Sequence, residues 1–199
     1  MKKILVILIL IFTLQTPSQA DDIRDFQIEG ISIGDSLLDY MSAKDIKEMF
    51  IVTKDHYKYL KKPHKFKEAY ITNPNFETYK AVSFFVKPDD KNYTIFSIRG
   101  IKSYVNNIDE CLKKRDEVAN EIKNIIPKFT KREEDVKSKL DKSGKSYSKI
   151  LEFLFESGDV IVISCNDWEE KLRIKNGWTE GLNVTVAKKD ISIWFNNRK

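Results

Sequence analysis

Histidine, cysteine, glycine and proline are all scarce in this sequence of 199 residues. A structural zinc site of the Cys₂His₂ kind would need both histidines and both cysteines of the chain, and two cysteines cannot build a disulfide-scaffold miniprotein. Seven glycines and five prolines exclude collagen-like and linker-dominated chains. The nucleophile elbow, the glycine-rich phosphate loop and the HExxH pattern are missing as well. The sequence therefore carries no catalytic signature.

The residues that are present are those of one globular domain. Hydrophobic residues make up 41% of the chain and aromatic residues 12%, which is too much for intrinsic disorder. No repeat of solenoid length and no linker divides the chain. We therefore expect a single domain over residues 21–199.

The first twenty residues have the pattern of a secretory signal peptide. A basic start with Lys2 and Lys3 precedes an apolar run over residues 4–14, and a stretch of small residues ends at Ala20. The apolar run is about half as long as a membrane-spanning helix needs, and no cysteine follows it for lipidation. We expect cleavage after Ala20, a soluble protein that is periplasmic or secreted, and no membrane span in the mature chain.

Export also changes how the charge is interpreted. The net charge of +5 falls to +3 once Lys2 and Lys3 are removed. Domains that bind nucleic acid concentrate a strong positive excess, so no nucleic-acid partner is expected.

An even pair of cysteines in an exported protein predicts a disulfide. Cys111 lies on an apolar stripe with helical spacing, and Cys165 ends the apolar run of residues 160–165. A helix packed across that strand would bring the two sulfurs into one layer. The alternatives are two buried free thiols or a nucleophilic cysteine, although neither cysteine has a nearby histidine or a CxxC partner.

Hydrophobic patterning predicts the helices and strands. Helices are expected after a cap at Asp35 or Ser36, after a Ser42–Asp45 capping box, and after an Asn107 cap as far as Pro127. Strands are expected over residues 81–87, 93–105, 146–155, 160–165 and 182–186, and residues 190–195 fit either a strand or a helix.

Other segments give weaker signals. A change in apolar parity predicts a bulge at Gly100. Residues 51–80 fit no element, residues 128–146 read as a solvated excursion, and residues 166–181 read as a loop. The pattern predicts an α+β fold in two layers: a mainly antiparallel sheet of five to six strands, with one long helix and short N-terminal helices on one face.

The segment of residues 54–68 is the first candidate binding site. Lys58, Lys61, Lys62 and His64 are interleaved with tyrosines there. Such a segment could hold an anionic ligand by neutralising its charge. The alternative is a solvated lysine-rich loop anchored by its aromatic residues. His56 and His64 lack a third ligand partner, so no metal site is expected.

The second candidate is the loop with Asp167, Trp168 and Trp178. Two tryptophans can stack on a sugar or another ring while Asp167 accepts hydrogen bonds. The alternative is that the tryptophans close one end of the core. Carboxylates near Asp35 are explained by helix capping, so no catalytic residue is assigned.

Three segments of the sequence resemble a known group. Residues 25–40 (DFQIEGISIGDSLLDY), together with residues 141–146 (DKSGKS) and 164–168 (SCNDW), are similar to small exported alphaproteobacterial proteins of unknown function. The Gly-Ile-Ser-Ile-Gly-Asp segment also loosely resembles the start of small outer-membrane assembly lipoproteins, without their lipidated cysteine. The first resemblance implies export and a single domain, and it implies no activity, cofactor or site.

We therefore expect an exported binding or interaction module without catalysis and without a cofactor. Its partner would be an envelope protein or an anionic or ring-bearing ligand, held by a sheet face or by the tryptophan loop. The alternatives are a cell-envelope hydrolase and a carrier of an apolar ligand between the long helix and the sheet.

Overall fold

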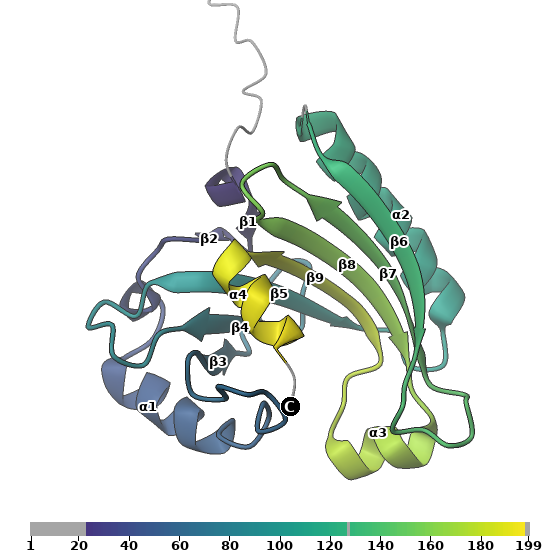
Figure 1. Ribbon diagram of the computed structural model, residues 1–199, viewed down its shortest axis with the longest axis horizontal. Coiled ribbons are helices and arrows are strands. Elements are labelled where there is room, and N and C mark those ends of the chain that lie inside the picture. Colours follow the sequence, from purple (N-terminus) through teal and green to yellow (C-terminus); the bar gives the residue numbers. More distant parts are fainter. Residues whose placement is uncertain (1–22, 127, 198–199) are drawn as a thin grey trace, which may run out of the picture.

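The computed structural model describes residues 23–126 and 128–197, which are built around one antiparallel sheet (Figure 1). The strands follow the order β3-β4-β5-β9-β8-β7-β6. The α+β class and the antiparallel sheet are confirmed, but the sheet has seven strands rather than five to six. The strands are β3 (Lys67–Ile71), β4 (Ala81–Val86), β5 (Ile95–Ser103), β6 (Thr130–Lys137), β7 (Tyr147–Leu154), β8 (Val160–Asp167) and β9 (Gly181–Ala187).

Helices lie on both faces of this sheet, so the expectation of helices on one face is wrong. In Figure 1, α4 lies in front of the sheet and α2 behind it. The reason is that residues 190–195, which fit either element in the sequence, are helical and apolar enough to cover the second face. The helices are α1 (Ala43–Val52), α2 (Ile108–Ile125), α3 (Glu170–Asn176) and α4 (Lys189–Asn196).

The long helix α2 covers the first face through its apolar stripe. Cys111, Ala119 and Ile122 are buried against β8 and β9. Asn107 caps its first turn by accepting a hydrogen bond from the Glu110 N–H at 3.3 Å, as the sequence predicts. The core on this face takes alternate residues of every central strand.

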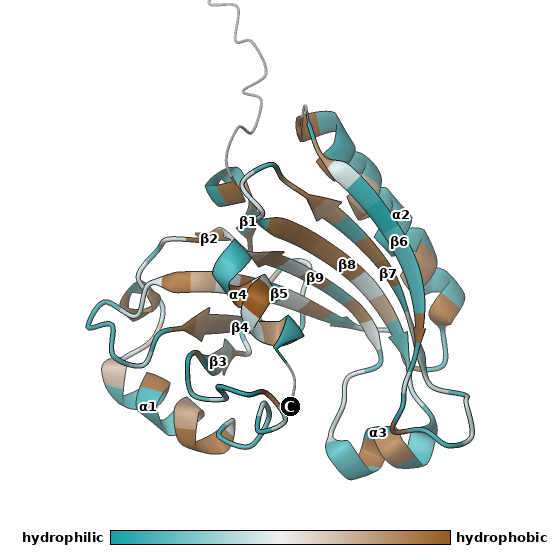
Figure 2. Cartoon of the chain, viewed as in Figure 1, coloured by the Kyte–Doolittle hydropathy of each residue, from teal (hydrophilic) through white to brown (hydrophobic). Residues whose placement is uncertain are grey.

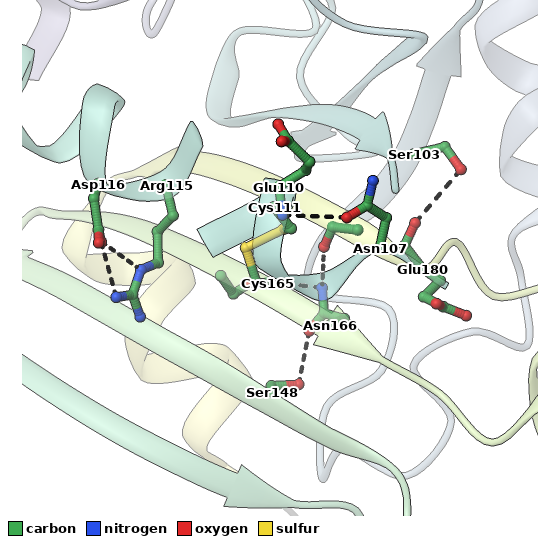
Figure 3. Close-up of a disulfide and its surroundings, with 12 residues drawn as sticks. Ser103, Asn107, Glu110, Cys111, Arg115, Asp116, Ser148, Cys165, Asn166 and Glu180 are labelled. Atoms are coloured by element: carbon green, nitrogen blue, oxygen red, sulfur yellow. Dashed lines mark hydrogen bonds and ion pairs between the residues drawn. A yellow bond between two sulfur atoms is a disulfide. The ribbon is translucent and has the colours of Figure 1, made fainter. Parts of the chain in front are cut away.

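A disulfide joins this helix to the sheet (Figure 3). Cys111 and Cys165 are bonded, with Cα atoms 5.9 Å apart, and both are fully buried. The predicted bridge is confirmed, and the alternatives of two free thiols or a nucleophilic cysteine are wrong.

The second face is covered at one end only. Ile191 and Trp194 of α4 pack on Phe85, Val160 and Ala187. A segment of residues 53–66, called the strap here, adds its own apolar side chains to this second core. Figure 2 shows β8 hydrophobic near α4 and more hydrophilic toward α3.

The two strands missing from the sequence-based prediction are the edges of the sheet. Residues 128–146 were expected to be a solvated excursion, but they contain β6, in which all eight residues are exposed. Because both of its faces meet solvent, β6 shows no hydrophobic alternation, and it is a strand because it pairs with β7. Its charges oppose edge-to-edge pairing with other chains. At the other edge, β3 lies against α1, and the Thr53 hydroxyl donates to the Glu68 carbonyl at 2.8 Å.

The N-terminal part follows the predicted pattern closely. The lead-in forms the hairpin β1 (Gln27–Ile28) and β2 (Ile31–Ser32), and Ser36 caps a short 3₁₀ turn, Leu37–Asp39. The Ser42 hydroxyl oxygen accepts from the Asp45 N–H at 3.2 Å at the start of α1, which confirms the cap at Ser42, and the Asp45 carboxylate accepts the Ser42 hydroxyl at 2.7 Å.

Two local predictions are wrong. The pairing of β4 with β5 runs regularly through Gly100, and the register shift lies between Phe85 and Val86. Gly100 instead makes room for the ring of Tyr79, which lies 2.7 Å from where a Cβ would stand. Residues 166–181 are not only loop, because α3 begins at Glu170.

Among residues 23–126 and 128–197, no helix is both long and apolar enough to cross a membrane. The signal peptide predicted over residues 1–20 lies outside the described residues.

Candidate functional site

The lysine-rich candidate segment lies in the strap and is held by its aromatic residues. The Tyr57 ring lies 5.4 Å from the rings of both Phe85 and Trp194, and Phe66 is buried beneath them. The Trp194 indole N–H donates to the Lys62 carbonyl at 2.6 Å. Tyr57 and Phe66 thus anchor the strap to the second face, whereas Tyr59 is exposed.

The four predicted binding residues of this segment are all exposed, and they do not converge on a cavity. Lys58, Lys61, Lys62 and His64 lie on the outer surface of the strap. His64 Nδ1 is 3.1 Å from the Lys67 ammonium nitrogen. This arrangement matches the alternative of a solvated loop with anchoring aromatics.

A buried carboxylate fastens the strap to the sheet. Glu68 is 7% exposed, and its Oε2 lies 3.0 Å from His56 Nδ1 and accepts the Tyr57 hydroxyl at 3.1 Å. Burial acts to raise the pKa of Glu68, but the His56 hydrogen bond and the charge of Arg99 outweigh it and lower that pKa. The same hydrogen bond raises the pKa of His56 against the opposing effect of its partial burial. The hydrogen-bonded His56–Glu68 pair therefore links the strap to the sheet.

The two tryptophans of the second candidate pack on each other. The centroids of the Trp168 and Trp178 rings are 4.9 Å apart, and the Trp168 indole N–H donates to the Thr179 carbonyl at 3.1 Å. Burial and the neighbouring Asp167 carboxylate raise the pKa of the Tyr147 hydroxyl. The loop and the strap lie at different ends of the sheet (Figure 1), so the structure does not combine the two candidates into one site.

Two polar cavities lie between α2 and the β6–β7 hairpin, on the first face. Their volumes are about 290 and 390 Å³, and Arg115 and Glu133 line both. Arg115 is already paired, with Asp116 Oδ1 at 2.8 Å (Figure 3) and with Glu133 Oε1 at 3.5 Å. Its charge is thus used to hold the helix to the hairpin.

The uncovered part of the second face carries a polar row that sequence reasoning missed. Ser83, Arg99 and Thr185 are direct register partners on β4, β5 and β9, so their side chains share one face at the middle of the sheet. Asn183 lies one step along β9 on the same face. We call these four residues the polar row.

The side chains of the polar row have few partners. Within the described part of the chain, no hydrogen bond or ion pair engages Arg99, Thr185 or Asn183, and the buried Ser83 hydroxyl has no partner either. Arg99 is partly buried and its guanidinium carbon lies 5.5 Å from the centre of the Phe85 ring. Ser83 is the one buried member of the row, and buried polar groups in folded proteins are normally hydrogen-bonded, whereas Arg99, Asn183 and Thr185 are partly exposed.

The surroundings of the polar row are mixed. The second core, with Phe85 and Val160, forms an apolar wall on the α4 side. On the other side, Val162, Ser164 and Ile150 are partly exposed neighbours on β8 and β7. A sheet face with a rigid wall and partnerless polar groups can bind a ligand with both apolar and hydrogen-bonding parts.

Fold and site together define an α+β protein with one closed sheet face and one partly open, polar face. No family model, curated protein or solved structure matches the chain. The resemblance of residues 25–40 to small exported proteins stays a prediction. Within residues 23–126 and 128–197, no group of three or more His, Cys, Asp or Glu side chains is arranged to hold a metal ion.

Proposed function

We propose that this chain is an exported, non-catalytic binding module whose ligand lies on the open part of the second sheet face. The observation that carries the proposal is the polar row of Ser83, Arg99 and Thr185, which runs across three central strands without hydrogen-bond partners. Because Arg99 and Thr185 are partly exposed and have no side-chain partner in the described chain, their donors are available to a ligand.

Export is part of the proposal. The sequence of residues 1–20 favours a signal peptide, and the Cys111–Cys165 disulfide fits an oxidising compartment. The N-terminus of the mature chain would then be Asp21.

The hydrolase alternative has less support. His56 is oriented by Glu68 at 3.0 Å, and Ser83 lies on the neighbouring strand β4, which gives the residue types of a Ser-His-Glu triad. However, no hydrogen bond joins Ser83 to His56 in the described chain, and Ser83 is only 1% exposed. A nucleophile needs both the base and access to its substrate.

The carrier alternative has less support as well. The space between α2 and the sheet is filled by the disulfide and by packed side chains such as Ile163 and Ala119. The cavities on that side are lined mainly by charged residues, including Arg115 and Glu133. An apolar ligand would not be favoured there.

The test is native mass spectrometry of protein exported with its own leader and purified without denaturation. We expect an N-terminus at Asp21 and a retained non-covalent ligand. Thr185→Trp should abolish retention because the new ring fills the open face. Val136→Trp is the matched control, because Val136 lies on the same face at the sheet edge. Equal retention by both variants would contradict the proposed face, and an uncleaved leader would contradict export.

A further inference from the structure

Arg99 is the one charged member of the polar row. It lies on β5, between β4 and β9, where the sheet has neighbouring strands on both sides. Its described contact is with the Phe85 ring, which lies under the guanidinium with 5.5 Å between the guanidinium carbon and the ring centre. This cation–π contact uses none of the five N–H donors of the guanidinium, which have no protein acceptor in the described chain.

The nearest acidic group does not use these donors. The charge of Arg99 helps to lower the pKa of Glu68, yet no ion pair within 4.0 Å joins the two side chains in the described chain. Glu68 Oε2 is taken by His56 and Tyr57 instead. The positive charge of Arg99 is therefore left without a bonded counter-charge.

The hydroxyl groups of Ser83 and Thr185 lie beside Arg99 and, like its guanidinium, are hydrogen-bond donors. Ser83 is its register partner on β4, and the Ser83 hydroxyl is buried with no acceptor. Thr185 is its register partner on β9 and is partly exposed. One cationic fork between two hydroxyl donors matches a group with several acceptor oxygens.

We propose that Arg99, flanked by Ser83 and Thr185, binds the carboxylate of a small ligand on the open sheet face. This inference rests on the proposed binding function and adds the chemical class of the ligand. A guanidinium binds a carboxylate through two parallel hydrogen bonds. The partly exposed Thr185 hydroxyl beside Arg99 can donate a further hydrogen bond to the same carboxylate.

The local charge favours a carboxylate over a phosphate. Arg99 contributes one positive charge, and the buried Glu68 nearby offsets part of its field. The next arginine on this face, Arg132, is paired with Glu152 at 3.7 Å. A phosphate dianion would need a second free cation, whereas one carboxylate is neutralised by Arg99 alone.

The experiment is an NMR titration of ¹⁵N-labelled protein with three probes at constant ionic strength: acetate, acetamide as its neutral isostere, and inorganic phosphate. We expect acetate to shift the Arg99 Nε–Hε signal and the amides of β5 and β9 in a saturable way. Acetamide should leave them in place, and phosphate should bind more weakly than acetate.

Variants locate the binding. Arg99→Gln should weaken acetate binding by at least about tenfold, the loss typical of a charged hydrogen bond. Arg99→Lys keeps the positive charge but loses the parallel N–H donors of the guanidinium, so its acetate affinity should lie between those of the parent and of Arg99→Gln. Arg132→Gln, on the same face, is the matched control and should bind acetate as the parent does. Thermal melting of each variant checks that it is folded.

The inference would be overturned by the absence of an acetate-dependent shift at Arg99, by an equal response to acetamide, or by unchanged acetate binding of Arg99→Gln. Tighter binding of phosphate than of acetate at Arg99 would also overturn it, by changing the ligand class. A retained native ligand that survives Arg99→Gln but not Thr185→Trp would refute the carboxylate site and leave the binding function standing.

Discussion

Reduction of the Cys111–Cys165 disulfide is expected to lower the free energy of unfolding by about 4 kcal/mol. The bond joins residues 54 positions apart. In the chain-entropy model, closing a loop of that length removes about 14 cal/mol/K from the unfolded ensemble, which gives about 4 kcal/mol at 25 °C. Domains are stable by roughly 5–15 kcal/mol, so this loss is a large fraction of the total. The bond also fastens α2 to β8, where the first core is centred.

Urea denaturation of oxidised and reduced protein measures this loss. Both sulfurs are fully buried, so reduction is carried out in denaturant before refolding. The denaturant slope should rise on reduction because the unfolded chain without its cross-link exposes more surface. Cys111→Ala combined with Cys165→Ala is the control, and reductant should not change its stability. A loss below about 1 kcal/mol with an unchanged slope would refute the loop-entropy reasoning.

Three further perturbations test other contacts. Gly100→Ala should destabilise by about 1–3 kcal/mol, because its Cβ would stand 2.7 Å from a tyrosine ring and the sheet leaves little room to adjust; urea denaturation measures it, and a neutral effect would contradict the close packing. The buried Glu68 carboxylate, with its lowered pKa, stabilises the fold above pH 4.5, and this contribution is lost as pH falls through the folded pKa. His56, with its raised pKa, stabilises below pH 6.5, and its contribution is lost as pH rises through the folded pKa. Glu68→Gln should therefore cost about 1–3 kcal/mol near pH 6 and flatten the decline in stability above pH 6.5; a parallel pH profile would contradict the pairing. Replacing both Arg132 and Glu134 with Val should cause concentration-dependent association in light scattering, since these exposed charges protect the edge strand β6, and a variant that stays monomeric would argue against that role.

The sequence predicts the elements whose burial differs between their two faces. The stripe around Cys111 and the alternation in residues 146–155 appear as α2 and β7. The disulfide could be predicted because a helical stripe and a buried strand each carried one cysteine. These signals depend on local periodicity, which hydrophobic burial imposes on the sequence.

The two edge strands could not be found in this way. In β6, Val136 is the lone aliphatic residue, and the strand is held by backbone pairing with β7. In β3, Glu68 contacts His56 of the strap, and the hydrophobic pattern of the local sequence does not predict this tertiary contact. Such elements are defined by their neighbours, so periodicity alone does not identify them.

The candidate site was only partly accessible to sequence reasoning. The alternation in β9 does place Asn183 and Thr185 on one polar face, and Arg99 is flanked by Ile98 and Gly100 in β5. Their meeting depends on the strand order, in which β9 pairs with β5 across the intervening elements of the chain. The strap is a candidate binding site in the sequence because its lysines are numerous, but Tyr57 and Phe66 beside them pack in the second core.

The most direct test of the central claim is a crystal structure of the protein purified natively from the exporting cell, with its ligand retained. The account predicts ligand density on the open sheet face, with a carboxylate against the Arg99 guanidinium and within hydrogen-bond distance of Thr185. Density between Trp168 and Trp178, or in the cavities beside Arg115, would contradict it, as would an open face occupied by water alone.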